Sequence, residues 1–332
     1  MKLHYDVRFG LARAAVYRDG KAQLYLQGYE ADPGLTVLGT RSVARLKGRA
    51  GGVGFLDLAD GGQAALDVTA DVLAHLNDGV ALDIEIAAEA RAGKLARARL
   101  VRVAEGEALR RLSPVLDLKA RSLAQARLLL GDDAVAVDDD IDALDAAREE
   151  ALNPSGALPG QGFLSIERTR ALIACDVDLG DGASGKAAVR RCNDIAIAEA
   201  ARRLRLSGLA GLVVIDLIGR RHDNEALRRT LERAFAAEAP RIMGAPVTKF
   251  GTLEFIRPWG ACPAMDLPAS LDIALRLLWT AVRESQGRPG RVLTLRAAPD
   301  VLDRIRPLIH NSYDPLAPLL RLEAGASPEV LS

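Results

Sequence analysis

The sequence predicts a multidomain α/β (α+β) protein with a small β-barrel near the N-terminus, a central α/β unit and a short α/β tail. Three observations predict this class. Short strand patterns separated by glycines fill residues 36–103. From residue 105 on, helical periodicity alternates with short apolar runs typical of buried strands. A chain of 332 residues, of which 49% are hydrophobic and 27% charged, can bury the cores of two or three domains.

Composition narrows the class of protein. No apolar run approaches the roughly 20 residues that a membrane span needs, so we expect no membrane partner. The N-terminus "MKLHYDVRFG" has no apolar core of a secretory signal. Cys175, Cys192 and Cys262 are too scattered for a disulfide framework or a zinc set. These features favour a reducing, cytoplasmic location.

The formal net charge is zero, but the charges are unevenly distributed. Arginines crowd into residues 91–102, 200–208 and 226–235, and acids gather in residues 131–145. Such a pattern is typical of ordinary solvated helix faces, and it is also compatible with one basic face that binds a polyanion.

The N-terminal half reads as strands followed by helices. Residues 12–29 alternate around Asp19-Gly20, which predicts a hairpin. Five or so short strands with glycine corners over residues 36–103 predict a closed barrel of the OB type. Helices are expected over residues 113–131, with a Ser-Pro start, and over residues 138–152, where an aspartate triplet matches the helix dipole.

The second half alternates strands and helices. The sequence predicts these elements in order: a hairpin over residues 162–178, a helix over 192–209 capped by Asn193 or Asp194, a buried strand over 210–219, a helix over 224–238 and a strand over 251–259. After a proline-rich break, the tail is predicted as a helix over 270–285, a strand over 291–299, a helix over 300–309 and a strand over 318–325.

Two of these strands end on carboxylates. "ALIACDVDLG" runs into Asp176 and Asp178, and "AGLVVIDLIG" runs into Asp216. Ligands bind at the carboxyl ends of strands in open α/β sheets, and carboxylates with water and a phosphate suit Mg²⁺. The pattern therefore favours a shared divalent-metal site, while a capping or turn role for each acid is the alternative.

These segments together resemble the ribonuclease E/G family. The resemblance is carried by "GFLSIERTRALIACDVDLG", by "NDIAIAEAARRLRLSGLAGLVVIDLIG" and by "APRIMGAPVTKFGTLEF" over residues 150–258, and it extends to the N-terminal strands and, more weakly, to the tail. It implies an RNase-H-like part (1–35 plus 104–155), an OB-fold RNA-binding domain (36–103), a DNase-I-like catalytic domain (156–262), and a linker helix with a small C-terminal domain (263–332).

The resemblance also implies roles for residues. Asp176 and Asp216 would be the metal ligands, with Mg²⁺, or alternatively Mn²⁺, as cofactor. Asp178 stands where the family usually has Asn, so an extra negative charge lies beside the metal. Lys249 stands where the family has Arg, which keeps a positive charge for phosphate but loses the bidentate fork. We count all four as catalytic residues.

The RNA-binding residues implied are Phe55, Arg91 and Lys94. Phe55 matches an aromatic residue that stacks on a base, whereas the second stacking position falls near Ala65. Lys94 matches a basic residue of the RNA surface, and the basic residues of "RAGKLARAR", Arg91 included, suit a groove that follows phosphates.

Two family features are absent from the sequence. Only Cys262 stands near the place of a Cys-Pro-x-Cys zinc link, so we expect no zinc and no zinc-linked dimer or tetramer. The segment after the barrel is too short for a 5′-end-sensing subdomain. The sequence thus predicts a Mg²⁺-dependent endoribonuclease acting on single-stranded RNA in processing or decay. The alternative is an RNA-binding protein of the same family whose catalysis has lapsed.

Overall fold

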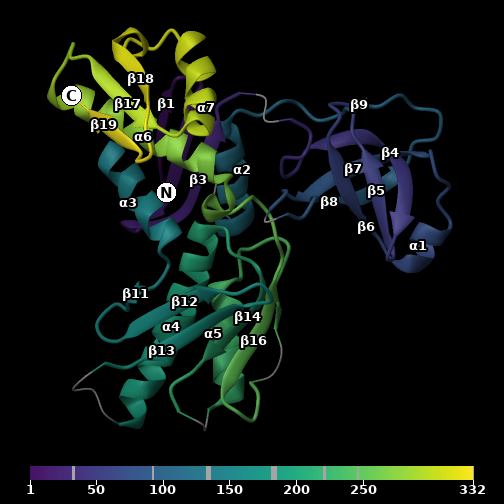
Figure 1. Cartoon of the computed structure of the whole chain (residues 1–332). Coiled ribbons are helices and arrows are strands. Elements are labelled where there is room, and N and C mark those ends of the chain that lie inside the picture. The colour runs from purple at the N-terminus through teal and green to yellow at the C-terminus, as the bar shows by residue number, and fades with distance from the viewer. Residues whose placement is uncertain are drawn as a thin grey trace.

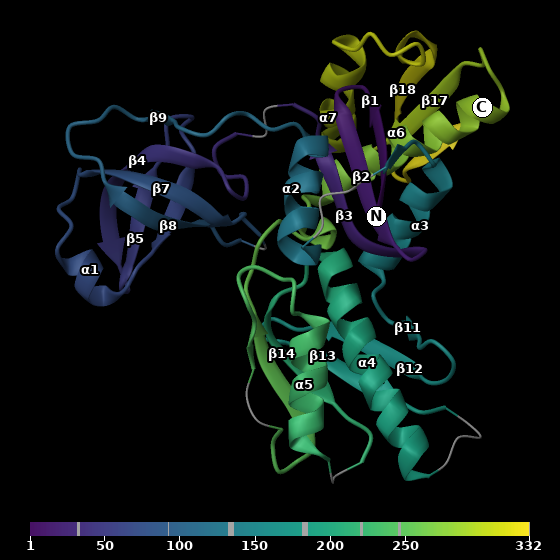
Figure 2. The ribbon, with the colours of Figure 1, turned by 180° about the vertical axis from the view of Figure 1, so that it is seen from behind.

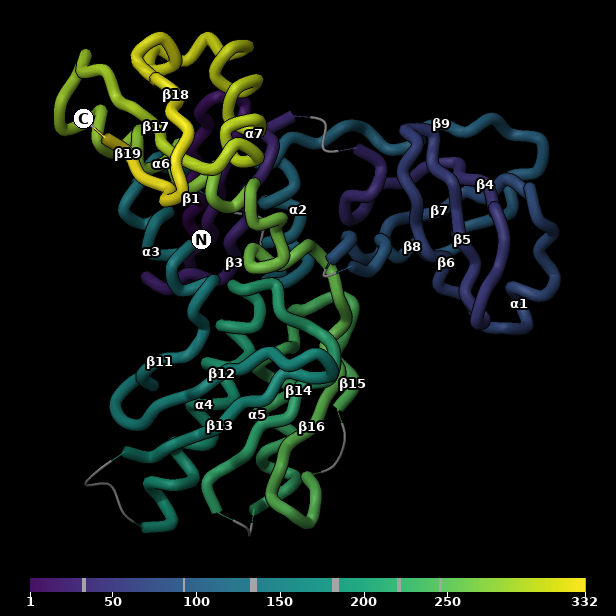
Figure 3. The backbone as a smooth tube through the Cα atoms, in the orientation of Figure 1, coloured from purple at the N-terminus to yellow at the C-terminus, as the bar shows by residue number. Residues whose placement is uncertain are grey.

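The computed structural model describes residues 1–31, 34–91, 93–131, 136–180, 185–219, 222–244 and 247–331 (Figure 1). The described residues form four β-sheets. The barrel lies to one side, the central α/β unit and the N-terminal sheet are stacked beside it, and the C-terminal sheet lies beyond the N-terminal one (Figures 1 and 3). The mixed α/β class predicted from the sequence is confirmed.

The N-terminal sheet has the strand order β10-β1-β2-β3. Its strands are β1 (Lys2–Arg8), β2 (Leu11–Arg18), β3 (Lys21–Tyr29) and β10 (Ala136–Asp138). Two helices pack on it, α2 (Leu118–Leu130) and α3 (Ile141–Leu152). The division of the chain into named domains stays a prediction.

Both helices of this part start at an aspartate. Asp140 caps α3 by accepting the Ala143 amide, as the acid-first pattern predicted. The predicted start of α2 at Ser113-Pro114 is wrong, because Asp117 accepts the Ala120 amide and the helix begins after it. Residues 132–135, which include the first two acids of the 131–145 run, lie outside the described residues.

A closed five-stranded barrel occupies the segment where the glycine-rich strands predicted one. Its strand order is β5-β6-β8-β7-β4, and a β4–β5 pairing closes the ring. The strands are β4 (Arg41–Ala50), β5 (Val53–Asp57), β6 (Gln63–Asp67), β7 (Ala81–Ala88) and β8 (Ala96–Val103), with helix α1 (Ala70–Ala74) and the short strand β9 (Arg110–Arg111) attached. Alternate residues fill the interior, including Leu46, Leu56 and Ile84.

The C-terminal part is a small sheet, β18-β17-β19, packed on two helices. Its elements are α6 (Ala269–Gly287), β17 (Leu293–Ala297), α7 (Pro299–His310), a 3₁₀ turn (Ala317–Leu319), β18 (Leu320–Ala324) and β19 (Glu329–Leu331). Phe9 and Leu11 from the N-terminal sheet join this core, so the two ends of the chain are packed together.

The central unit is a six-stranded mixed sheet with the order β11-β12-β13-β14-β16-β15. Its elements are β11 (Gly156–Ala157), β12 (Phe163–Arg168), β13 (Ile173–Asp178), α4 (Lys186–Ser207), β14 (Gly211–Asp216), α5 (Asn224–Ala234), β15 (Met243–Gly244), β16 (Thr252–Arg257) and a 3₁₀ turn (Ala264–Asp266). Strands β13 and β14 are parallel, and β12 and β16 run antiparallel to them.

Helix α4 corrects one prediction. It begins at Lys186, so neither Asn193 nor Asp194 caps it. The buried amide of Asn193 instead forms two hydrogen bonds with the backbone of Ile218, at 3.1 and 3.0 Å. A polar residue that suggested a helix start from sequence therefore holds the chain that leaves β14.

One carboxylate fastens the barrel to the central unit. Glu89, just after β7, accepts the backbone amides of Leu38 at 3.1 Å and of Cys262 at 2.9 Å. Its own amide donates to the carbonyl of Gly260 at 2.8 Å. The barrel is thus tied both to the segment that enters it and to the loop after β16.

The arginine-rich segments differ from one another. In residues 200–208, Arg202, Arg203 and Arg205 are buried, so this segment is neither a solvated helix face nor a basic surface. In residues 226–235, Arg228 and Arg229 are exposed and form ion pairs along α5, as a solvated face predicts. Among the described helices, none combines the length and apolar character needed to cross a bilayer.

Candidate active site

The central sheet has one face sealed by helices and one face open. Cys175, Val177 and Ile215 point to the sealed side and share a core with α4 and α5. Figure 2 shows both helices in front of the sheet, and Figure 1 shows the strands from the opposite side. Because side chains alternate along a strand, Asp176 and Asp216 belong to the open face, and both are exposed.

The two aspartates are direct neighbours. Asp176 of β13 is the register partner of Asp216 of β14. The same row continues on both sides, with Ser165 of β12 opposite Asp176 and Thr252 of β16 opposite Asp216. Neighbouring strands lie about 4.8 Å apart, so the two carboxylates are within the reach of one cation.

Within the described part of the chain, this carboxylate pair has no cationic partner. No ion pair of the described residues involves Asp176 or Asp216. Like charges directly opposite each other across two strands are destabilising. Within the described ranges no cluster of three or more His, Cys, Asp or Glu could hold a metal. Two carboxylates are nevertheless sufficient for Mg²⁺, which keeps several waters and uses substrate phosphates as further ligands.

Asp178 lies on the same face, two residues beyond Asp176 and opposite Phe163 of β12. Its side chain is exposed, and one oxygen accepts the Gly180 amide at 2.9 Å. This bond is the local turn role that the sequence left open as an alternative. It occupies one acceptor site and leaves others available for water, so the predicted catalytic role of Asp178 stays a prediction.

Lys249 lies on the turn that leads into β16, three residues before Thr252, the register partner of Asp216. The turn is closed by the Thr248 amide, which donates to the Thr252 carbonyl at 2.9 Å, and by a 2.7 Å hydrogen bond between the two hydroxyls. The Lys249 ammonium lies 5.2 Å from the ring centre of Phe250, and that ring is 74% exposed. One turn therefore presents a cation and an aromatic face next to the aspartates.

The sealed side of the sheet makes the aspartate row rigid. Burial raises the pKa of Cys175, directly before Asp176, to about 12, so this thiol is an uncharged core residue. Asn193 fixes the backbone just beyond Asp216 through Ile218. These contacts hold β13 and β14 in one register without using the side chains of the aspartates.

Phe55 lies on the outer face of the barrel, partly exposed on β5. Its register partner on β6 is Ala65, and the partner of Ala65 on β8 is Arg97. The second stacking position inferred from the resemblance is therefore directly beside Phe55, where a small side chain stands in its place. Arg97 extends the row, and its charge is paired with Asp67 at 2.6 Å.

Arg91 and Lys94 lie where the barrel meets the central unit. They form an isolated backbone bridge to each other. Lys94 is exposed, whereas Arg91 is buried, with its guanidinium 4.0 Å from the ring centre of Trp259. The structure thus places these two predicted RNA-binding residues at a junction and separates them from the aspartate row along β13.

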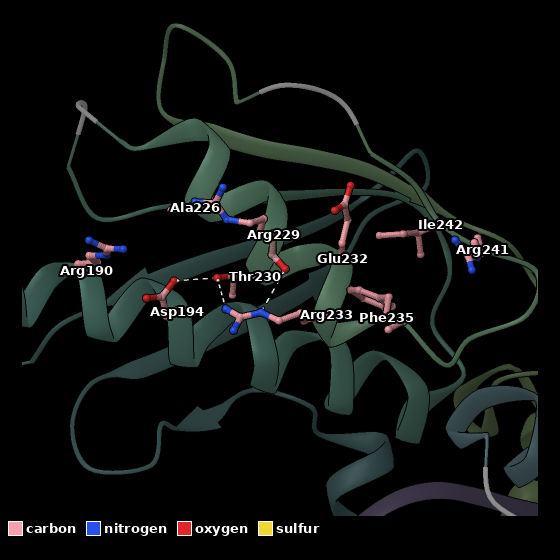
Figure 4. Close-up of a pocket in the computed structure, with 11 residues that line it drawn as sticks. Arg190, Asp194, Ala226, Arg229, Thr230, Glu232, Arg233, Phe235, Arg241 and Ile242 are labelled. Atoms are coloured by element: carbon pink, nitrogen blue, oxygen red, sulfur yellow. Dashed lines mark hydrogen bonds between the residues drawn. The ribbon is translucent and has the colours of Figure 1, made fainter.

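A second basic surface lies on the helix side of the sheet. A cavity of about 720 Å³ lies between α4 and α5. Arg190, Arg229, Arg233 and Arg241 line it (Figure 4). Thr230 donates to Asp194 at 3.1 Å and accepts from Arg233 at 3.2 Å. Because the sheet separates this cavity from the aspartates, its arginines do not contribute to the same site.

Sequence reasoning missed several residues around the site. Ser165 and Thr252 are the register partners of the aspartates, and Phe250 lies on the turn two residues before Thr252. Trp259 contacts Arg91 at the junction with the barrel. An exposed aromatic within "TKFG" was a detectable sign for Phe250. Ser165 and Thr252 could be found only from the strand register.

Comparison with known proteins agrees with these features. Residues 101–259 match the model of the Ribonuclease E/G family. Ribonuclease E of Nostoc sp. (strain PCC 7120) is 35% identical over 119 residues, which are 34% of this chain and 17% of that protein. Ribonuclease E of Synechocystis sp. (strain PCC 6803) is 32% identical over 119 residues, covering 34% of this chain and 18% of the relative. Ribonuclease E of Escherichia coli (strain K12) is 34% identical over 115 residues, covering 33% and 11%.

These matches span less than a fifth of the length of the relatives. The barrel strands β4–β7 and the C-terminal part lie outside the family match, so their resemblance stays a prediction. Asp176, Asp216 and Lys249 all lie inside it. The central part of this chain, residues 101–259, is therefore similar to the Ribonuclease E/G family, as the motifs between residues 150 and 258 predicted.

Proposed function

We propose that this chain is an endoribonuclease that cleaves single-stranded RNA in RNA processing or decay. One observation carries the proposal: Asp176 and Asp216 lie face to face on an open sheet surface, and no described residue forms an ion pair with either of them. The ribonuclease E/G match over the same strands supports an activity on RNA. With all three cysteines free, we take the cytoplasm as the compartment.

The donor set fits Mg²⁺, with Mn²⁺ as the alternative. Asp176 and Asp216 would hold the ion, and the remaining positions would be left to water and to the phosphate of the substrate. Bound there, the ion would lower the pKa of a coordinated water and offset the charge that develops on the phosphodiester.

The protein residues around the pair then have separate tasks. Lys249, on the turn beside Asp216, would hold a phosphate oxygen of the strand through its ammonium group. The exposed ring of Phe250 offers a stacking face for a base next to that phosphate. Asp178 would accept a hydrogen bond from the attacking water, because its second oxygen remains available after the bond to Gly180.

The barrel supports the proposal as the part that binds the strand. Phe55 on its outer face would stack on one base, a contact that contributes about 1–3 kcal/mol. With Ala65 as its neighbour, the platform holds one base where two aromatic residues would hold two. We therefore expect a weaker grip on the RNA than a two-aromatic barrel gives.

The test is cleavage of a labelled A/U-rich single strand by the purified full chain, with Mg²⁺ or with EDTA. The key variant is Asp216→Asn. The matched control is Glu167→Gln, a carboxylate on the same open face of β12 whose register partner is Ala174. Cleavage that EDTA and Asp216→Asn abolish, and Glu167→Gln preserves, supports the proposal.

Two other outcomes would contradict this proposal. Cleavage that neither EDTA nor Asp216→Asn affects would end the role of the aspartate pair. Tight binding without any cleavage would favour the second candidate, an RNA-binding relative whose catalysis has lapsed. The features that favour that candidate are Asp178 in place of Asn, Lys249 in place of Arg, and Ala65 beside Phe55.

A further inference from the structure

A pocket of about 590 Å³ lies at the junction of the barrel and the central sheet, at the opposite end of β13 and β14 from the aspartates. Four of its described lining residues are cationic: Arg91 and Lys94 from the β7–β8 loop, and Arg168 and Arg170 from the β12–β13 turn. Asp266 is the acidic residue of this lining. The pocket therefore carries a strong excess of positive charge.

Arg91 is a buried cation without a carboxylate partner among the described residues. It is 8% exposed, and its one side-chain hydrogen bond there is a long one, 3.4 Å, to the carbonyl of Glu89. Burial lowers the pKa of Arg91, and the charge of Arg97 lowers it further. A buried guanidinium is normally paired, so a protein that keeps one unpaired in a pocket has a place for an external anion.

The pocket is rigidly built around Trp259. The Arg91 guanidinium lies 4.0 Å from the Trp259 ring centre, and that of Arg168 lies 5.8 Å from it. Gly211 has φ +99°, and a Cβ there would lie 3.3 Å from the indole nitrogen, so glycine allows the ring to pack against the start of β14. The indole thus fixes the position of two guanidinium groups.

Asp266, the acidic residue of the lining, already has a cationic partner. Asp266 forms a 2.5 Å ion pair with Arg168, and its carboxylate is buried. Lys94 and Arg170 are exposed, and the described residues offer their side chains no hydrogen bond or ion pair. Three of the four cations therefore have donors available for an incoming anion.

The position of the pocket indicates which anion it takes. Phe55, Ala65 and Arg97 form one row across the barrel, and Lys94 precedes β8, on which Arg97 lies. On the other side, Ile173 of the pocket begins β13, about 10 Å before Asp176 on the same strand. We propose that this pocket binds a backbone phosphate of an RNA strand running from the Phe55 platform to the Asp176–Asp216 pair, an inference that rests on the proposed function.

The indole of Trp259 provides a direct readout. The chain has two tryptophans, and Trp279 is buried beside Arg13 in another part of the molecule. Titrating the Asp216→Asn protein, which cannot cut, with a short single-stranded RNA should change the Trp259 fluorescence. The change should disappear in Trp259→Phe. Inorganic phosphate should produce the same change at higher concentration.

The pocket variant is the double substitution Lys94→Ala/Arg170→Ala, which touches exposed side chains only. It should weaken RNA binding roughly tenfold at moderate salt and reduce the slope of log K against log salt by about 0.7, the value for one phosphate contact of a single strand. Arg291→Ala, an exposed arginine before β17, is the charge-matched control and should change neither quantity.

These measurements distinguish failure of the pocket proposal from failure of the proposed function. RNA binding with unchanged affinity in the double variant, and no response of Trp259, overturns the pocket while the nuclease proposal stands. A Trp259 response to phosphate without RNA binding or cleavage overturns the proposed function and the RNA strand as the source of the anion. A response only to RNA with a 5′-phosphate, and not to the same strand with a 5′-hydroxyl, would replace the internal phosphate by a terminal one.

Discussion

Two sets of carboxylates in the central unit have opposite surroundings. Glu238 is 4% exposed and accepts from Arg205 at 3.0 Å and from Arg257 at 2.9 Å. Asp176 and Asp216 are exposed, repel each other across two strands and have no ion-pair partner among the described residues. Both sets belong to the same sheet-and-helix unit, yet one is fully neutralised and the other is not.

The difference separates carboxylates that hold the fold together from carboxylates whose exposed oxygens could bind a cation. A buried charge without its partner is costly, so the arginine contacts of Glu238 are a condition of folding. The repulsion between Asp176 and Asp216 is small at an exposed site, and a cation would remove it. The same carboxylate-to-amide change should therefore have opposite consequences in the two places.

The largest effect is expected for Glu238→Gln. It leaves Arg205 and Arg257 buried with an uncharged partner and should lower the free energy of unfolding by about 3–5 kcal/mol. Urea denaturation measures this loss. Glu232→Gln, which removes an exposed partner of Arg228 on α5, is the control and should cost less than about 1 kcal/mol. Equal effects of the two variants would contradict the comparison.

The opposite behaviour is expected for Asp176→Asn. Cleavage should fall at least about 100-fold, the loss that even an outer-shell partner of a metal ligand can cause. The free energy of unfolding should stay the same or rise slightly, because one of two repelling charges is gone. Single-turnover cleavage and urea denaturation of the same preparation check both halves. If Asp176→Asn lost its activity because it unfolds, Asp176 would be a carboxylate that stabilises the fold, as Glu238 is.

A smaller effect is expected at the barrel. Phe55→Ala should weaken RNA binding by about 1–3 kcal/mol, since one base loses its stacking partner, and should leave the cleavage rate of saturated enzyme unchanged. Ala65→Phe places a second ring beside the first and should strengthen binding. Fluorescence anisotropy measures both changes. If Phe55→Ala lowers the rate at saturation instead, the barrel acts on the aspartate site itself.

The smallest effect concerns the sealed side of the sheet. Burial raises the pKa of Cys175 to about 12. At pH 8 this buried thiol should stay protonated and react with an alkylating reagent only after denaturation, which mass spectrometry measures. Because folding raises this pKa, the protonated thiol contributes to the free energy of unfolding. That contribution is complete below the pKa of an unfolded thiol and is lost as the pH rises from there towards 12. Rapid labelling of Cys175 would show that the face behind Asp176 is not a closed core.

Local pattern was sufficient to predict most elements of the fold. The acid at Asp140, the glycine corners of the barrel and the apolar strands before Asp176 and Asp216 each have a local physical cause, and the structure has the expected elements there. The start of helix α4 was predicted wrongly because Asn193 is a residue type that often caps helices. In the structure its side chain instead forms hydrogen bonds with the backbone of the distant Ile218. A hydrogen bond between residues far apart in the chain produces no repeating pattern in the sequence, so the sequence could not predict it.

The site was predictable in part for the same reason. Asp216 ends β14 and Asp176 lies two residues before the end of β13, so their convergence follows from parallel pairing. Their neighbours Ser165 and Thr252 depend on the register of two antiparallel strands, which sequence alone does not fix. The burial of Arg202, Arg203 and Arg205 was equally hidden, because charge predicts exposure unless the partners from other segments are known.

The contacts of Glu89 have a mechanical consequence. Its carboxylate grips Leu38 at the entrance to the barrel and Cys262 beyond β16, while its amide holds Gly260. These three hydrogen bonds restrict movement of the barrel relative to the sheet. Under the proposed function, the distance from Phe55 to the aspartates would then act as a ruler that sets how many nucleotides separate the stacked base from the cleaved bond.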